Sequence, residues 1–217
     1  MKKLLSLALI FCLLAGCNTP VEPPALEPEA APEAASQMEE SPAPQHGQPA
    51  PAQPAPGEIE VSFAYVKRSG PGSNQFAVWI EDEAGSHIKT LYSTRFTADG
   101  GWKIREMSLP LWVERFAIAS RTQEDIDMVS SATPGPGTLS YRWDLTDEYG
   151  AAVPGGQYRV MVEGSTLMEN RVLYSCDITL GETVAIASPQ PQPEYFGEDT
   201  APREMLSDVS ILWIPVL

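Results

Sequence analysis

Residues 57–65 read Gly-Glu-Ile-Glu-Val-Ser-Phe-Ala-Tyr, and at this stretch the chain takes on the pattern of a folded domain. Apolar residues alternate with small or charged ones, so that Ile59, Val61, Phe63 and Tyr65 share one face of an extended segment. A period of two residues is typical of a β-strand with one buried side. The stretch therefore predicts a β-rich fold whose core lies against this face.

The same alternation recurs along the rest of the chain. Further apolar sets with this period are Phe76/Val78/Ile80, with Trp79 on the opposite face, then Leu139/Tyr141/Trp143, Tyr158/Val160/Val162, residues 172–180 and Val209/Ile211/Trp213. The turn at residues 83–86 predicts that residues 87–93 return as a hairpin partner. About seven strands in roughly 160 residues predict a mostly β sandwich over residues 57–217. We expect residues 188–203 to form a long loop, and the C-terminal run from Ser207 to be a late edge strand.

One segment has a helical period instead. Its apolar residues recur three or four positions apart at Leu109, Trp112, Val113, Phe116 and Ala117. Ser108 stands where an N-cap belongs, and Pro110 is compatible with a first helical turn. We therefore predict one short amphipathic helix over residues 109–120, covering one end of the sandwich.

The segment before the sandwich has a different composition. Residues 18–56 are rich in proline, alanine and glutamate and contain no lysine, arginine or aromatic residue. Such a segment cannot bury enough apolar surface to offset the entropy of ordering. We expect a disordered tether, partly in polyproline II conformation, that follows residue 17.

The N-terminus has the pattern of an export signal. Lys2 and Lys3 precede an apolar run of about ten residues, which is too short to span a bilayer. The run ends in Leu14-Ala15-Gly16-Cys17, which resembles a bacterial lipobox. The resemblance implies removal of residues 1–16 and lipidation of Cys17, which would hold the protein on the outer face of the cytoplasmic membrane or on an outer membrane facing the periplasm. The alternative is an ordinary secretory signal with an incidental cysteine.

Charge and residue counts exclude several classes of function. The formal net charge of the chain is −15, which disfavours nucleic acid and anionic lipid headgroups as partners. Cys176 is the one cysteine beyond the tether, and we expect it to be a small core residue without a disulfide. His87 is the one histidine there, and we expect it on the surface of a strand. No metal-ligand cluster, phosphate loop or catalytic triad is evident, so we predict that the protein is not an enzyme.

Residues 143–158 carry a turn motif, Trp-Asp-Leu-Thr-Asp-Glu-Tyr-Gly-Ala-Ala-Val-Pro-Gly-Gly-Gln-Tyr. The carboxylates of Asp144 and Asp147 can accept hydrogen bonds from their own loop, and Gly150 can adopt positive φ, so we predict a hairpin. The motif resembles the hairpin of the immunoglobulin-like module of flagellar hook-capping proteins, which implies an immunoglobulin-like sandwich. The alternative is a calcium site at Asp144 and Asp147, although the alternating ligand spacing of a calcium loop is absent.

A second motif, Asp-Met-Val-Ser-Ser-Ala-Thr at residues 127–133, precedes a Pro-Gly-Pro-Gly turn. Together with the hairpin motif and residues 76–82, it makes the region 57–217 resemble the bacterial periplasmic family called domain of unknown function 2271. That resemblance implies an extracytoplasmic location and a fold, but no defined activity.

The same motif resembles the flavin-attachment signature Asp-x-x-Ser/Thr-Gly-Ala-Ser/Thr. In proteins with that signature, an extracytoplasmic flavin transferase attaches FMN through its phosphate to the last hydroxyl. Asp127, Ser130, Ala132 and Thr133 match the signature, and Thr133 would be the acceptor. Ser131 departs from it, because the signature has glycine there. The alternative is a small-residue loop between a helix and a strand.

These observations predict a lipid-anchored, extracytoplasmic, non-catalytic β-sandwich without a cofactor. Its role would be that of an accessory module that binds an envelope protein or a glycan. The alternative is an electron carrier with FMN on Thr133, for which a flavin transferase would be a partner.

Overall fold

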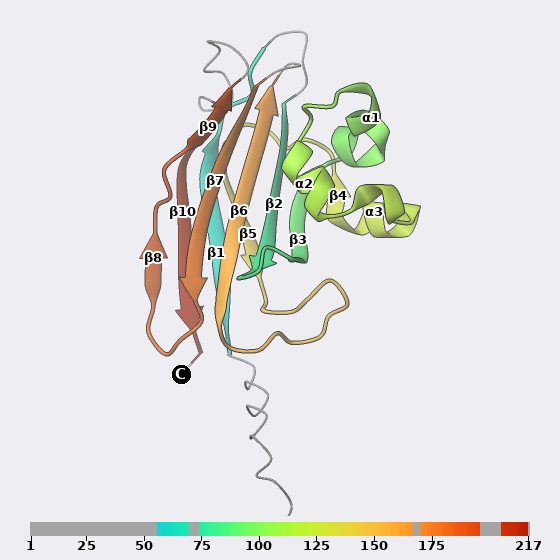
Figure 1. Cartoon of the computed structure of the whole chain (residues 1–217). Helices are drawn as coiled ribbons and strands as arrows, with labels where there is room; N and C mark the ends of the chain where they lie inside the picture. Colours follow the sequence, from blue (N-terminus) through green and yellow to red (C-terminus); the bar gives the residue numbers. More distant parts are fainter. Residues whose placement is uncertain (1–55, 70–73, 167–169, 196–204, 217) are drawn as a thin grey trace, which may run out of the picture. The chain divides into compact units, whose positions relative to one another are not determined.

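The computed structural model describes residues 56–69, 74–166, 170–195 and 205–216. The predicted signal segment, the lipidation site Cys17 and the tether up to residue 55 lie outside these ranges. The described residues form two facing β-sheets, and a layer of short helices lies against one of them (Figure 1). The prediction of a mostly β fold with two sheets is confirmed.

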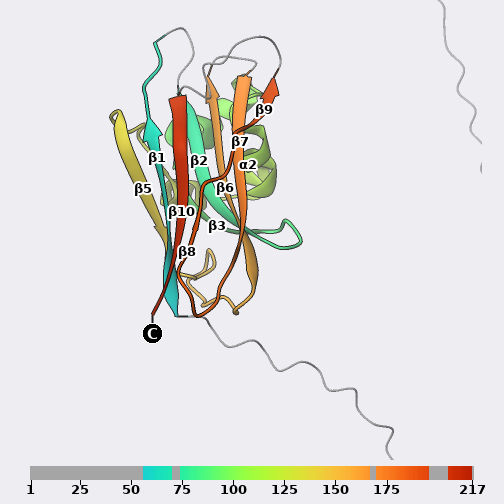
Figure 2. The same cartoon turned by 90° about the vertical axis from the view of Figure 1, so that its left-hand side faces the viewer.

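The two sheets differ in size. The strands are β1 (Gly57–Tyr65), β2 (Gln75–Asp82), β3 (His87–Thr94), β4 (Ser130–Ser131), β5 (Gly137–Trp143), β6 (Gln157–Thr166), β7 (Asn170–Thr179), β8 (Ala185–Ala187), β9 (Gln192–Tyr195) and β10 (Leu206–Pro215). One sheet has the order β5-β1-β10-β8 and faces the viewer in Figure 2, and the other has the order β4-β3-β2-β6-β7-β9. Neighbouring strands are antiparallel except β3 and β4, which are parallel.

The main core lies between the two sheets. The four apolar residues that alternate along β1, Ile59, Val61, Phe63 and Tyr65, are all at most 1% exposed. They pack with the inward faces of the other strands, at Phe76/Val78/Ile80, Tyr158/Val160/Val162 and Val209/Ile211/Trp213. The alternation in the sequence therefore identified the buried face of each of these strands correctly.

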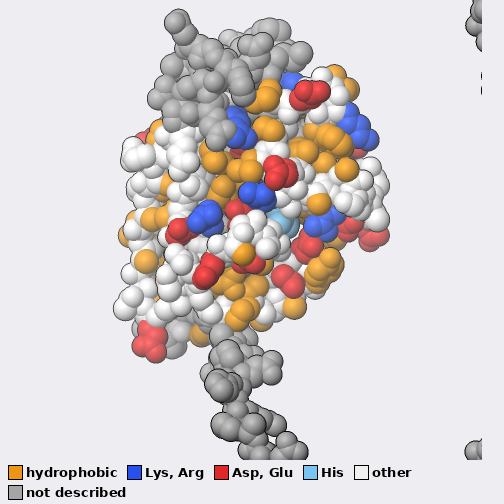
Figure 3. Space-filling model, viewed as in Figure 1, with side chains coloured by type: hydrophobic (Ala, Val, Ile, Leu, Met, Phe, Trp, Pro, Cys, Tyr) orange, Lys and Arg blue, Asp and Glu red, His pale blue; other side chains and the backbone are white. Residues whose placement is uncertain are grey.

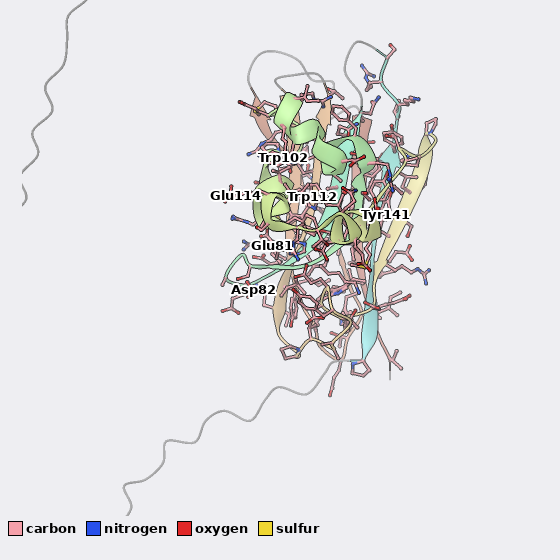
Figure 4. All side chains as sticks on the ribbon, turned by 90° about the vertical axis from the view of Figure 1, so that its right-hand side faces the viewer. Glu81, Asp82, Trp102, Trp112, Glu114 and Tyr141 are labelled. Atoms are coloured by element: carbon pink, nitrogen blue, oxygen red, sulfur yellow. The ribbon has the colours of Figure 1, made fainter. Side chains whose placement is uncertain are left out.

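A second core lies on the outer face of the six-stranded sheet. The helical segments are η1 (Thr97–Gly101), α1 (Trp102–Ile104), α2 (Pro110–Arg115), η2 (Ile118–Ser120) and α3 (Gln123–Val129). Trp79 of β2 is fully buried beneath these segments. It packs in one cluster with Trp112 of α2 and with Phe116, which follows α2, and the rings of Trp112 and Phe116 stack with centroids 5.1 Å apart. Figure 4 shows Trp112 in the middle of the sheet face that the helices cover, with Tyr141 on β5 to one side. The face of β2 on which Trp79 lies, opposite the main core, is thus a second buried surface.

The prediction of a single helix over residues 109–120 is wrong in two respects. Helix α2 ends at Arg115, because Ala117 has left-handed backbone angles (φ 52°) that separate α2 from η2. The helices also cover the outer face of the six-stranded sheet rather than one end of the sandwich. Pro110 does occupy the first turn of α2 as expected.

Ser108 is not the N-cap of α2. Leu109 occupies that position with φ 56°, and the hydroxyl of Ser108 instead lies 2.5 Å from that of Thr97. The backbone amides of Leu111 and Trp112 donate to the carboxylate of Glu163 on β6, at 3.3 and 2.9 Å. A buried side chain from the sheet thus satisfies amides that a local cap usually satisfies.

Three further expectations need correction. Residues 143–158 do not join two paired strands, because β5 and β6 belong to different sheets and the loop crosses between them. The predicted hairpin is present only locally, where Thr146 and Ala152 form an antiparallel bridge and the amide of Asp147 donates to the carbonyl oxygen of Ala151. The C-terminal strand β10 is not an edge strand, since it pairs with both β1 and β8. Residues 192–195 of the predicted long loop form β9, which pairs with β7, while residues 196–203 lie outside the described ranges.

Candidate functional site

The motif at residues 127–133 spans the end of helix α3 and the short strand β4. Thr122 caps α3 through a capping box with Asp125. Asp127, in the last turn of the helix, is exposed and lies 3.4 Å from the guanidinium of Arg95 on the chain segment after β3. Asp127 therefore lies at the surface with a basic neighbour.

The remaining motif residues follow in an extended segment. Ser130 is 7% exposed and pairs with Ser93 of β3, so its hydroxyl points into the protein. The hydroxyl of Tyr92 donates to the carbonyl oxygen of Ala132 at 3.1 Å, and burial raises the pKa of Tyr92 to about 12. Thr133 follows in an exposed position. The structure thus places Thr133 and Asp127 at the surface and Ser130 beneath it.

Ser131 occupies the position that is glycine in the flavin-attachment signature. It lies in β4, opposite Thr94, and it is not among the residues with positive φ. An extended backbone accepts serine as readily as glycine. The departure from the signature therefore causes no backbone strain in this structure.

The loop between β5 and β6 is fixed by its own carboxylates. The Oδ1 atom of Asp147 accepts hydrogen bonds from the amides of Tyr149 and Ala151, both at 2.9 Å. Asp144 accepts from the backbone and hydroxyl of Thr146 and binds the ammonium of Lys89 at 2.9 Å. The predicted bonding within the loop and the positive φ of Gly150 (82°) are confirmed. Both carboxylates have structural partners, which favours the turn interpretation over the calcium site.

The loop and the helical segment enclose a pocket of about 250 Å³ that the sequence did not indicate. It lies over Lys89 and Thr90 of β3, and its other lining residues are Phe116, Arg121, Asp125, Met128, Val129, Glu148 and Tyr149. Figure 3 shows acidic, basic and hydrophobic side chains mixed over α3 and this loop. No sequence signal predicts the pocket, because its walls come from residues 89–90, 116–129 and 148–149, which meet only in the folded chain.

Arg121 joins the two walls of the pocket. Its guanidinium lies 4.5 Å from the ring centroid of Phe116 and 2.8 Å from the carboxylate of Glu148. Its Nε atom also donates to the carbonyl oxygen of Phe116 at 2.9 Å. These contacts fix the loop against the helical segment, so that the pocket is formed before any ligand binds.

Two large side chains on the rim remain exposed. Tyr149, at the tip of the loop, is 83% exposed, and Met128, on α3, is 69% exposed. Exposed aromatic and methionine side chains beside a pocket are characteristic of binding surfaces.

His87 is buried behind this pocket, which corrects the expectation of a surface residue. Its side chain is 5% exposed, packs against Phe116 and lies 2.8 Å from the hydroxyl of Thr90 through Nε2. Burial lowers the pKa of His87 to about 4, despite the carboxylate of Glu148 4.0 Å away. The imidazole is therefore neutral at physiological pH.

Cys176 is half-buried on β7 and packs against the main core, and burial raises the pKa of its thiol. Within the described ranges, no group of three or more histidine, cysteine, aspartate or glutamate side chains is arranged to hold a metal ion. The helices in the part of the chain that the structure describes lack the length and apolar character needed to cross a bilayer.

One comparison with known proteins gives a match. The family model described as "Predicted periplasmic protein (DUF2271)" matches residues 57–195, which begin at β1 and end with β9. No curated protein and no solved structure gives a significant match.

Proposed function

Because the chain belongs to the DUF2271 family of predicted periplasmic proteins, we propose that it is a lipid-anchored, extracytoplasmic module that acts by binding rather than by catalysis. The observation that carries the proposal is the preformed pocket with Tyr149 and Met128 exposed on its rim. Two large side chains exposed together beside a preformed pocket offer apolar contact area to a partner. The pocket would contact an envelope protein.

The charged groups around the pocket support binding over catalysis. Lys89 binds Asp144, Arg121 binds Glu148, and Asp125 accepts a hydrogen bond from Thr122. Each of these groups therefore has a structural partner. They form ion pairs and a helix cap, which is consistent with a binding surface.

The membrane anchor is tested by phase partitioning in detergent. Cys17→Ser removes the thiol that would accept the diacylglyceryl group, so we expect the variant to leave the detergent phase or to remain as an unprocessed precursor. Normal processing and equal partitioning of the variant and the wild type would contradict lipidation.

The binding surface is tested by photo-crosslinking in the native cell envelope. A photoreactive phenylalanine analogue replaces Tyr149, and the matched control carries it at Ile186, which is 72% exposed on β8 of the other sheet. We expect one defined adduct from position 149 and none from position 186. Absence of an adduct at 149, or the same adduct at both positions, would contradict a partner at this pocket.

A second candidate function is that of an electron carrier with FMN on Thr133. It is supported by the exposure of Thr133, by the extended backbone of Ser131 and by the presence of Asp127, Ser130 and Ala132 at the signature positions. The phosphate of the flavin would be esterified to the Thr133 hydroxyl by a separate transferase. The exposed loop gives such an enzyme access to this hydroxyl.

Co-expression with an extracytoplasmic flavin transferase, followed by in-gel flavin fluorescence, tests this candidate. The flavin-carrier candidate predicts fluorescence in the wild type, none in Thr133→Ala, and wild-type intensity in Thr138→Ala, an exposed threonine on β5. A wild-type protein that stays non-fluorescent would eliminate the flavin carrier and leave the binding module.

A further inference from the structure

The pocket between helix α3 and the loop 144–150 has the size of a single large side chain. Its volume of about 250 Å³ falls below the range of about 300–1,000 Å³ that holds drug-sized ligands. The ring of Phe116 and the side chain of Val129 give it an apolar lining. A flat aromatic side chain would fit this space and bury its ring faces against apolar atoms.

The surroundings of the pocket are acidic on both sides. Helix α3 contributes Glu124, Asp125 and Asp127, and the loop contributes Asp144, Asp147 and Glu148. The charged residues of the lining are balanced, with Lys89 and Arg121 against Asp125 and Glu148. In the surroundings, Lys89 and Arg121 are bound to Asp144 and Glu148, and Arg95 is bound to Asp127, so three cations face these six carboxylates. Among the described residues, the carboxylates of Glu124 and Asp125 form no salt bridge. The rim therefore carries an excess of negative charge.

This excess persists at physiological pH. Hydrogen bonds from the backbone and hydroxyl of Thr122 lower the pKa of Asp125, which lines the pocket. The whole chain adds a long-range field of the same sign, with a formal net charge of −15. An approaching segment with lysine or arginine residues would be attracted, and an acidic one repelled.

The exposed ring of Tyr149 adds a second contact for a basic segment. At 83% exposure, most of the ring is open to a lysine or arginine head group. Cations pack favourably over the face of an aromatic ring. Met128, on the facing wall, has a flexible side chain that adapts to the shape of an inserted ring.

We propose that this pocket binds an aromatic side chain flanked by lysine or arginine residues, presented by an extracytoplasmic partner protein. The inference rests on the proposed binding function and names the chemistry of its partner. The ring of Phe116 is covered by Trp112 and by the guanidinium of Arg121. The aromatic ring of the partner would therefore lie against Arg121, Met128 and Val129, and the flanking cations would face Asp125 on one side and Tyr149 on the other.

Three labelled peptides test the proposal against the full-length protein by fluorescence anisotropy. Their sequences are Gly-Lys-Trp-Lys-Gly, Gly-Lys-Ala-Lys-Gly and Gly-Glu-Trp-Glu-Gly, with the same dye and linker on each. We expect the first to bind at least about tenfold more tightly than the other two. Raising the ionic strength from about 0.05 to 0.5 M should reduce this preference over the acidic peptide, because salt screens the exposed carboxylates.

Variants locate the binding on the protein. Tyr149→Ala and Met128→Ala should each weaken binding of the Lys-Trp-Lys peptide at least about threefold, and Asp125→Asn should reduce its advantage over the acidic peptide. Asparagine keeps an oxygen for the cap of α3, so the helix is retained. The matched controls are Ile186→Ala and Ile104→Ala, whose side chains are 72% and 79% exposed outside the pocket lining, and these should bind as the wild type does.

Equal binding of the three peptides, or equal binding by the Tyr149→Ala and control variants, would overturn the proposal. Displacement of the peptide by riboflavin at a comparable concentration would also overturn it, because the pocket would then accept a flat heterocycle without flanking cations. A crosslink from position 149 combined with no peptide preference would refute only the partner chemistry. A missing crosslink at 149 would refute the binding function itself.

Discussion

The carboxylate of Glu163, on the central strand β6, accepts a hydrogen bond of 2.9 Å from the backbone amide of Trp112 in helix α2. The same carboxylate accepts from the amide of Leu111 and lies 3.2 Å from the guanidinium of Arg171 on β7. Glu163 is fully buried, and this burial raises its pKa, while the hydrogen bonds and Arg171 act in the opposite direction. One side chain therefore links the helical layer to two strands of the sheet beneath it.

Glu163→Ala should lower the free energy of unfolding by about 3–5 kcal/mol, because it removes one partner of a buried ion pair. It also leaves the amides of Leu111 and Trp112 without this acceptor. Glu163→Gln should cost less, since the amide oxygen can still accept one of these bonds. Urea unfolding followed by tryptophan fluorescence measures both changes.

The matched control for Glu163 is Glu114→Ala. Glu114, labelled in Figure 4, forms an ion pair with Arg115, and its side chain is 71% exposed. Exposed ion pairs contribute little to stability, so we expect a change within about 0.5 kcal/mol. Similar losses at Glu163 and Glu114 would contradict a structural role that depends on burial.

Trp143→Ala should destabilise the sandwich by about 3–5 kcal/mol. The indole is fully buried, packs edge-to-face with Tyr158 at 5.0 Å and donates to the carbonyl oxygen of Thr146 at 2.7 Å. Its removal leaves a cavity where the loop crosses between the sheets. Thermal unfolding of this variant beside Ile104→Ala, which lies on the surface, measures the cost. Equal midpoints would show that the indole is not in the core.

The strand faces could be predicted from the sequence because burial in a sandwich imposes a period of two residues. Ile59, Val61 and Phe63 are buried together for this reason. The second buried face could not be predicted, since it is formed by Trp79 and Met161 together with polar residues such as Glu163. From the sequence alone, such polar residues are predicted to lie on the surface, because the helices that cover them are not evident.

The helical break and the pocket depend on contacts between distant segments. Ala117 has left-handed backbone angles, although this conformation usually occurs at glycine, so the sequence around it does not predict the break. His87 looks like a surface residue by sequence, but the helical segment brings Phe116 over it. The motif residues around Thr133 could be found from their spacing, whereas the pocket required the tertiary structure.

Gly57→Ala should destabilise the protein by about 1–3 kcal/mol through steric overlap. A Cβ atom at this position would lie 2.3 Å from Cη2 of Trp213 and 2.6 Å from the carbonyl oxygen of Ile214. The indole cannot easily move away, because its Nε1 donates to the carbonyl oxygen of Gly181 at 3.0 Å. Differential scanning calorimetry compares this variant with Gly135→Ala, whose new Cβ would meet no atom within 4 Å. A Gly57→Ala midpoint equal to that of Gly135→Ala would contradict the overlap.

His87 should make the stability of the domain depend on pH between about 6.5 and 4. The buried imidazole has its pKa lowered to about 4, whereas in the unfolded chain the pKa stays near 6.5. As the pH falls through this interval, the unfolded chain binds a proton that the folded protein does not, so stability is lost. The loss from this residue amounts to about 2 kcal/mol at pH 5 and levels off below about pH 4.

Urea unfolding of the wild type and His87→Gln at pH 7.5 and pH 5.0 measures this loss of stability. The carboxylates of the domain titrate in both proteins, so the difference between the two pH dependences isolates His87. We expect the wild type to lose about 2 kcal/mol more than the variant, and parallel losses would show that the imidazole is accessible to protons in the folded state.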